Sequence, residues 1–142
     1  MQLLFKKINK NIVIKILNSY YKIKNYYEII EWLLSNNYIT YISMDELIFH
    51  AAYFNDFKLV KIYTEKVGYF LDNLTSIAVK NNNLEMVKWC IDKQAYDFKD
   101  AIYKAASKNN FEMLQLLDKA NSIRHKDEKF NYSGVLACAI SN

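Results

Sequence analysis

The chain has 142 residues, of which 52% are hydrophobic and 24% are charged, and its formal net charge is +4. This length suits one domain with a substantial core, so we expect a single repeat domain over residues 1–142. The sequence contains no run of 18 apolar residues and no signal-peptide pattern at its N-terminus, which predicts a protein that stays in the cytoplasm.

The first 24 residues carry six lysines and no acidic residue, and they include the apolar stretch IVIKIL. A basic, partly apolar segment of this kind could bind nucleic acid or an anionic membrane surface. Lys, Asn, Ile and Tyr have codons rich in A and T, however, and these residues dominate the whole chain. A solvated face of a capping helix is therefore the favoured interpretation, and accessory nucleic-acid or membrane-surface binding is kept as an alternative function.

The middle of the chain repeats with a step of 27 residues, as Ala51, Ala78 and Ala105 show. Two further positions keep the same spacing; they are Leu59, Met86 and Met113, and Val60, Val87 and Leu114. Self-similarity at a fixed step is the signature of a repeat architecture. We expect repeats at 44–70, 71–97 and 98–124. YEIIEW at 27–32 resembles LEMVKW at 84–89 and indicates an N-terminal capping unit at 1–43, and AISN at 139–142 indicates a loop and an incomplete unit at 125–142.

Each repeat is predicted to be a pair of helices separated by a polar turn. In 44–70, one apolar face consists of Leu47, Ile48, Ala51 and Ala52, and a second consists of Phe57, Leu59, Val60, Ile62 and Tyr63. The polar pairs 55–56, 82–83 and 109–110 lie between such faces. Because Asn tolerates the left-handed backbone conformation, these pairs indicate helix–turn–helix units. Glu28, Glu85 and Glu112 recur at one position and are interpreted as first-turn acids that stabilise the second helix.

These units resemble the ankyrin repeat family, whose consensus runs T-P-L-H-x-A-A-x-x-G-H-L-E-V-V-K-L-L. The stretches ELIFHAAYFNDFKLVKIY, LTSIAVKNNNLEMVKWC and AIYKAASKNNFEMLQLL follow its second half. Asn55, Asn82 and Asn109 stand where the family has its turn Gly, and Gln94 and Asn121 stand near its second turn Gly.

The T-P-L-H signature is missing, and the step is shorter than the family's usual length of about 33 residues. The resemblance therefore implies an all-α fold, an ankyrin-like α-solenoid of stacked helix–turn–helix units with shortened or absent β-hairpins. Another α-solenoid and a non-repeating helical bundle are the alternatives. The short, Asn-rich units look like the ankyrin-like arrays of large DNA viruses and amoebae, and a viral origin would place the protein in the host cell cytoplasm.

No residue pattern predicts a catalytic, metal or cofactor site. The two histidines, His50 and His125, and the two cysteines, Cys90 and Cys138, do not form the short ligand pairs of a zinc site. Two glycines in the whole chain leave no glycine-rich phosphate loop. We therefore predict a protein that is not an enzyme, with reduced cysteines packed in its core.

The resemblance implies a non-enzymatic protein–protein interaction module that binds a partner through the concave face of the solenoid. In ankyrin-like binders the residues after the Ala pair and those at the unit tips face the partner. Carried over, the first group is Tyr53, Phe54, Lys80, Asn81, Ser107 and Lys108, and the second is Asp45, Asn73 and Asp100. Tyr53 and Phe54 have two interpretations, an exposed binding hot spot or part of the core.

The incomplete C-terminal unit predicts an uncovered apolar surface that includes Val135, Leu136 and Ile140. Self-association through this end and further sequence beyond residue 142 are both consistent with that pattern. The identity of any partner protein is not encoded in a motif.

Overall fold

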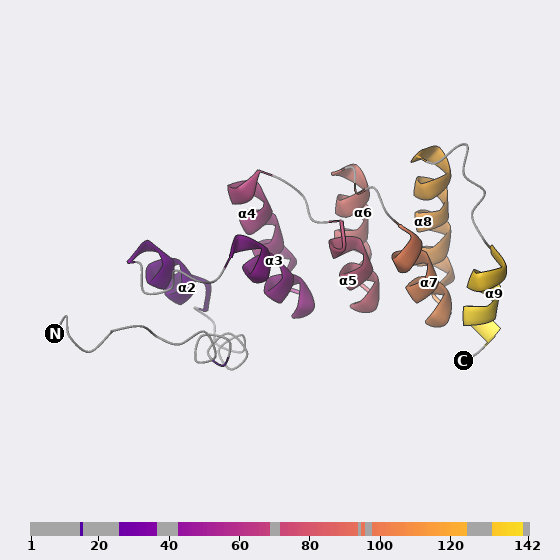
Figure 1. Cartoon of the computed structure of the whole chain (residues 1–142), viewed down its shortest axis with the longest axis horizontal. Coiled ribbons are helices and arrows are strands. Elements are labelled where there is room, and N and C mark those ends of the chain that lie inside the picture. Colours follow the sequence, from indigo (N-terminus) through magenta and orange to yellow (C-terminus); the bar gives the residue numbers. More distant parts are fainter. Residues whose placement is uncertain are drawn as a thin grey trace. The chain divides into compact units, whose positions relative to one another are not determined.

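The computed structural model describes residues 15, 26–36, 43–68, 72–93, 95, 98–124 and 132–140. Their helices are α2 (Tyr26–Ser35), α3 (Met44–Tyr53), α4 (Phe57–Val67), α5 (Leu74–Lys80), α6 (Leu84–Asp92), α7 (Lys99–Ser107), α8 (Phe111–Arg124) and α9 (Tyr132–Ile140) (Figure 1). These residues include no β-strand, which confirms the all-α prediction and the short or absent hairpins. In the described part of the chain no helix has the length and apolar character needed to cross a membrane. The N-terminal lysine segment lies outside the described residues, apart from the exposed Lys15.

The chain divides into two compact units, Met1–Val67 and Gly68–Asn142. In the first unit α3 packs against α4. Their buried residues are Leu47, Ile48, Ala51 and Ala52 on α3, and Leu59, Val60, Tyr63 and Thr64 on α4. The predicted α3 face is confirmed, whereas Phe57 and Ile62 of the predicted second face are only half-buried. An ion pair between Lys66 and Glu31 joins α4 to α2.

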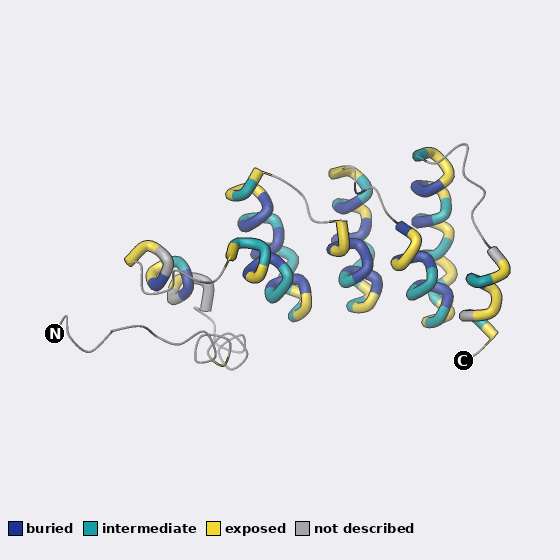
Figure 2. Tube along the Cα trace, in the orientation of Figure 1, coloured by how far each residue is buried: buried dark blue, intermediate teal, exposed yellow. Residues whose placement is uncertain are grey.

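In the second unit α5 pairs with α6 and α7 pairs with α8, while α7 also packs against both α5 and α9 (Figure 1). Ala78 and Ala105, two of the alanines that recur at the 27-residue step, are completely buried. Buried apolar residues lie on every helix of the two pairs (Figure 2). Each completely buried aliphatic side chain, such as Val87 or Leu117, contributes roughly 1.5–3 kcal/mol to the stability of the stack.

The first helix of each described pair ends in a Schellman motif at the predicted Asn. Asn55, Asn82 and Asn109 have positive φ values of 63°, 54° and 51°. The next amide returns to a carbonyl in the last turn: Asp56 N donates to Ala51 O (2.8 Å), Asn83 N to Ala78 O (2.9 Å) and Asn110 N to Ala105 O (3.0 Å). The prediction of left-handed Asn at these turns is confirmed, and the motif satisfies carbonyls that the helix end would otherwise leave exposed.

The residue after each left-handed Asn begins the second helix. The side-chain oxygens of Asp56, Asn83 and Asn110 accept hydrogen bonds from the amides of Leu59 (3.1 Å), Met86 (2.8 Å) and Met113 (3.0 Å). These are N-caps, each of which is worth about 1 kcal/mol. Glu85 and Glu112 lie in the first turns of α6 and α8, and Glu28 in that of α2, as predicted.

Two predictions for the C-terminal part are wrong. Asn121 does not mark a turn, because α8 continues through it to Arg124 and Asn121 is buried within the helix. Arg124 stabilises this extension: its guanidinium donates to the carbonyl of Ile91 at 2.7 Å and lies over the ring of Phe98. Val135, expected on the uncovered surface, is 7% exposed, whereas Leu136 and Ile140 are exposed as predicted.

Candidate functional site

In the first unit, the predicted binding residues Tyr53 and Phe54 form an aromatic cluster with His50 at the C-terminal end of α3. The rings of Tyr53 and Phe54 meet edge to face, with centroids 5.3 Å apart and planes at 87°. The His50 ring is tilted against Phe54 at 4.9 Å. Tyr53 is 60% exposed and Phe54 is half-buried. Tyr53 is therefore not a core residue, and its ring contacts that of Phe54.

Burial lowers the pKa of His50 below its ordinary value. The imidazole is therefore neutral at pH 7, since a desolvated charge is costly and the depressed pKa lies below that pH. The part of the aromatic cluster presented to solvent is thus mainly the ring of Tyr53, a residue type that is enriched in binding hot spots.

In the second unit, the equivalent positions hold polar residues, and one of them, Lys108, connects one repeat to the next. The Lys108 ammonium donates to the carbonyl oxygen of Lys80 at 2.6 Å. Ser107 donates to the carbonyl of Lys104 at 3.0 Å, within its own helix. Asn81 is the half-buried C-cap of α5. Lys80 and Lys108 are thus brought together, and part of their hydrogen-bonding capacity is used in holding the layers.

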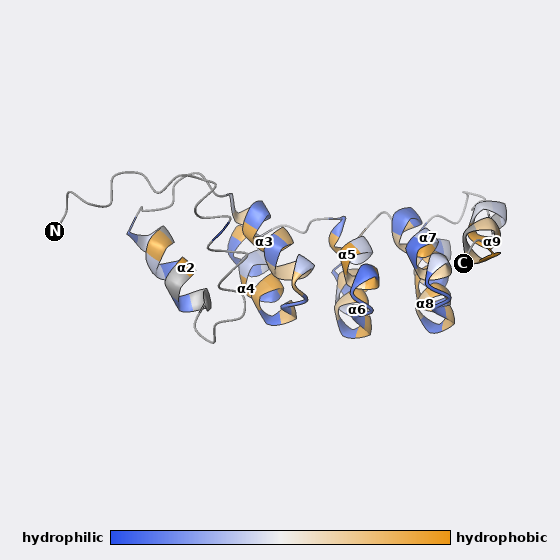
Figure 3. Cartoon of the chain, turned by 90° about the horizontal axis from the view of Figure 1, so that it is seen from below, coloured by the Kyte–Doolittle hydropathy of each residue, from blue (hydrophilic) through white to orange (hydrophobic). Residues whose placement is uncertain are grey.

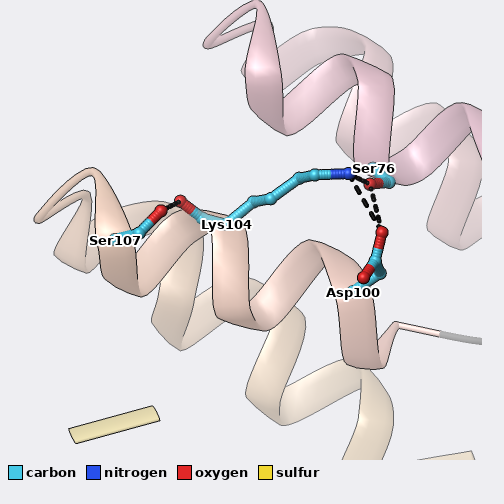
Figure 4. A network of polar contacts seen from close by, with 4 residues as sticks. All are labelled: Ser76, Asp100, Lys104 and Ser107. Atoms are coloured by element: carbon cyan, nitrogen blue, oxygen red, sulfur yellow. Dashed lines mark hydrogen bonds and ion pairs between the residues drawn. The ribbon is translucent and has the colours of Figure 1, made fainter. Parts of the chain in front are cut away.

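The predicted tip residues differ in their surroundings. Asp45 lies in the first turn of α3 and is half-buried, and Asn73 is exposed directly before α5 without forming a side-chain cap. Asp100, in the first turn of α7, accepts hydrogen bonds from Lys104 (3.0 Å) and from the Ser76 hydroxyl (3.2 Å). Lys104 also contacts the Ser76 oxygen, so that three side chains from α5 and α7 converge (Figure 4).

The Ser76, Asp100 and Lys104 network was not predicted from the sequence. The spacing of four residues between Asp100 and Lys104 is the signal that could have indicated the ion pair. A second unpredicted link joins the two turns of this unit, because Asn110 Nδ2 donates to Asn82 Oδ1 at 2.6 Å. Both features hold adjacent repeats in register, and neither resembles a reactive centre.

Cys90 has the properties of a core residue. Burial raises the pKa of its thiol to about 12, an effect that outweighs the hydrogen bond with Thr75. The thiol is free and completely buried, and a nucleophilic cysteine needs the opposite, an accessible thiolate near neutral pH.

Among the described residues no group of three or more His, Cys, Asp or Glu side chains is arranged to hold a metal ion.

Residues 74–117, which span α5 to the middle of α8, match the family model described as ankyrin repeats (many copies). The match covers the two helix pairs that carry the Schellman and N-cap turns at Asn82–Asn83 and Asn109–Asn110. Ankyrin repeats are generally protein–protein interaction modules without catalytic activity, and no enzyme family was found. No curated protein and no solved structure matches the chain, and nothing in these comparisons supports a viral origin.

Proposed function

We propose that this protein binds another protein through the C-terminal ends of its first helices, the face that is concave in ankyrin repeat arrays, with Tyr53 as an anchor. The observation that carries the proposal is the exposure of an aromatic ring at a position where the two later repeats have Lys80 and Ser107. Aromatic side chains dominate interface energetics because they bury a large area with few rotatable bonds. Scaffold positions recur between repeats, whereas this position varies.

The surroundings of Tyr53 favour recognition over simple exposure. Its ring is held edge-on by Phe54, so less side-chain entropy is lost when a partner covers it. Phe54 is in turn supported by His50, which lies one turn earlier on α3.

A photo-crosslinking experiment tests the proposal directly. p-Benzoylphenylalanine at position 53 should crosslink to a defined partner in an extract of the source cell. The same label at Lys58, which is exposed on α4, should not. Equal crosslinking from both positions would show that the aromatic cluster is not the contact.

Affinity measurements with the identified partner then give the size of the effect. Tyr53→Ala should weaken binding by about 30-fold, as expected for a hot spot worth about 2 kcal/mol. Lys58→Ala should leave the affinity unchanged, and circular dichroism should be the same for both variants. Undiminished binding by Tyr53→Ala would refute this assignment. The alternative role of the N-terminal lysine segment rests on residues outside the described ranges, and no observation favours it.

A further inference from the structure

Lys104 of α7 and Lys108, the C-cap of that helix, both reach across to α5. The Lys108 ammonium donates to the carbonyl oxygen of Lys80 at 2.6 Å, and the Lys104 ammonium contacts the Ser76 hydroxyl (Figure 4). Residues 104 and 108 are four apart on one helix, as 76 and 80 are on the other, so the two contacts lie one turn apart on the same face. Lys80 is itself exposed at the end of α5. We call these three lysines, 80, 104 and 108, the lysine face.

The charges on the lysine face are balanced unequally. Lys104 forms an ion pair with Asp100 at 3.0 Å. Lys108 is exposed and bonds to a neutral carbonyl, and no carboxylate in the described part of the chain forms an ion pair with it. An ammonium group has three donors, so the bond to Lys80 leaves donors on Lys108 that can serve a ligand. The carbonyl bond therefore fixes the position of a positive charge without neutralising it, and less side-chain freedom is lost when an anion binds there.

The adjacent helix ends act against an anion, but the lysines outweigh them. α5 ends at Lys80 and α7 ends at Ser107. Each helix C-terminus carries about half a negative elementary charge, which gives roughly one negative charge for both ends. Lys80 and Lys108 bring two positive charges to the same place. The surface at the ends of these two helices is therefore positive.

The lysine face is a local feature and does not follow from the overall charge. Outside the first 24 residues, acidic side chains outnumber basic ones in the chain. Figure 3 shows α5 and α7 in one row and α6 and α8 in the other. The first row, with Lys108, holds four lysines and one acidic residue, whereas the second row holds three basic and four acidic residues. Positive charge in the second unit is thus concentrated on its first helices.

The arrangement fits a short acidic segment of a protein better than a nucleic acid. DNA carries one negative charge about every 1.7 Å, and proteins that bind it neutralise several phosphates in succession. On the lysine face the cations are few, and the exposed Asp100 lies one turn before Lys104 on α7, where it would repel a continuous phosphate backbone. A peptide with one or two carboxylates can reach Lys80 and Lys108 without passing Asp100.

We propose that the C-terminal ends of α5 and α7 bind an acidic segment of a partner protein, with Lys80 and Lys108 donating to its carboxylates. Hydrogen bonds between charged groups are stronger than those between neutral groups, and complementary charge speeds association and selects the partner. The inference rests on the proposed function in one respect, that the ends of the first helices contact a protein. The site lies within the second unit, and Tyr53 is not part of it.

Fluorescence anisotropy tests the site on the full chain, with a short peptide of alternating Glu and Ser residues that carries a neutral fluorophore. Lys80→Gln/Lys108→Gln should bind this peptide about tenfold more weakly than the wild type, because two charge-assisted contacts are lost. Lys88→Gln/Lys119→Gln is the matched control, since both lysines are exposed on the second helices α6 and α8 and the net charge changes by the same amount. The control should bind like the wild type.

A single substitution keeps the test decisive if loss of the Lys108 bond disturbs the packing of the repeats. Lys80→Gln leaves the backbone carbonyl of residue 80 in place, and with it the acceptor for Lys108. This variant should bind the peptide about threefold more weakly, because one exposed charge pair is lost. Circular dichroism and the melting temperature should be the same as in the wild type.

Three results would overturn the inference. The first is a wild-type chain that does not bind the peptide at low ionic strength, and the second is an equal loss of affinity in both double variants, which would indicate attraction by net charge alone. The third is oligothymidylate binding that is tighter than peptide binding and depends on Lys80 and Lys108, which would assign the lysine face to nucleic acid.

The outcomes for the two units can be told apart. If the peptide experiment fails while position 53 still crosslinks to a protein, only the acidic-segment inference is refuted. Peptide binding that depends on Lys80 and Lys108, without crosslinking from position 53, would support the lysine face and refute Tyr53 as an anchor.

Discussion

Gly134 of α9 faces the ring of Tyr103 on α7 so closely that a methyl group on its Cα would lie 2.9 Å from the Tyr103 hydroxyl oxygen and 3.0 Å from the nearest ring carbon. Such distances are below van der Waals contact, so the absence of a side chain at 134 lets α9 approach α7. Glycine normally weakens a helix, and the close packing against Tyr103 explains why position 134 is a glycine.

Replacing this glycine should disturb the docking of α9. Gly134→Leu should lower the free energy of unfolding by about 1–3 kcal/mol, the usual cost of overpacking, despite the better helix propensity of Leu. Urea titration monitors the change. Tyr103→Ala in the Gly134→Leu background should recover part of the loss, and a purely additive double mutant would contradict direct contact between the two positions.

Two different substitutions of Asn109 should change the stability of the protein in opposite directions. Because its φ is 51°, Asn109→Gly should stabilise the protein by up to about 1 kcal/mol, whereas Asn109→Ala should destabilise it by about 1 kcal/mol. The adjacent Asn110 is the matched control. It acts as an N-cap through its side chain, so that both Asn110→Gly and Asn110→Ala should reduce stability. Thermal melts of the four variants give the comparison.

The network of Asp100, Lys104 and Ser76 should stabilise the fold at neutral pH, and this stabilisation should be lost in acid. Hydrogen bonding and the charge of Lys104, with a further hydrogen bond from Ser76, hold the pKa of Asp100 below its ordinary value. A depressed carboxyl pKa stabilises the fold above the unfolded-state pKa, and this contribution is lost as the pH falls through the folded-state pKa. Asp100→Asn should lower the melting temperature slightly at pH 7 and by progressively less as the solution becomes strongly acidic. The effect is small because the Asp100 side chain is 78% exposed.

Lys104→Met provides the reciprocal test of that network. It should remove most of the effect of Asp100→Asn, so that the double variant is little less stable than Lys104→Met alone. If the two substitutions instead lower the stability additively, the ion pair between Asp100 and Lys104 does not cause the destabilisation by Asp100→Asn.

The burial of His50 predicts a second contribution to stability that is lost as the pH falls. Because burial lowers its pKa, the unfolded chain binds a proton more readily than the folded one. Stability attributable to His50 is therefore complete above the unfolded value of about 6.5 and decreases as the pH falls through that value toward the folded pKa. Urea unfolding at pH 7.5 and 5.5 should show a loss in the wild type that is smaller in His50→Gln. An equal loss in both proteins would assign the effect to other groups.

Cys90 should be protected from thiol reagents while the protein is folded. Its pKa of about 12 and complete burial leave almost no accessible thiolate at pH 8. A Cys138→Ser variant makes Cys90 the only thiol, and its labelling should accelerate steeply as urea approaches the unfolding transition. Fast labelling without urea would show that the α5–α6 pair opens readily.

The helix pairs could be predicted because local rules determine them. The 27-residue step and the alternation of apolar faces with Asn pairs reflect backbone geometry within a few residues, and the positive φ values of Asn55, Asn82 and Asn109 confirm that interpretation. The length of α8 could not be predicted in this way. The contact of Arg124 with the Ile91 carbonyl joins residues 33 apart, and it keeps Asn121 inside a helix where the family resemblance suggests a turn.

The positions that make up the candidate site could be predicted, but the way in which their side chains contact one another could not. Periodicity places Tyr53 and Phe54 together at the end of a helix but does not separate their environments, which depend on how the Phe54 ring meets His50. Likewise, sequence position gives no indication that Lys108 reaches the Lys80 carbonyl in the preceding layer. Contacts of this kind depend on the spacing between repeats, which only the packed structure supplies.

The turn within each helix pair contains no spare residue. Asp56, Asn83 and Asn110 each close the last turn of one helix with their amide and begin the next helix with their side chain. An insertion or deletion there would break one of these two bonds, whereas the connections between successive pairs vary in length, from six residues at 68–73 and 93–98 to seven at 125–131 and eight at 36–43. Over evolutionary time, changes in chain length should therefore accumulate between helix pairs and be eliminated within them, so that related sequences would differ in the number of residues separating pairs while keeping three residues at every turn.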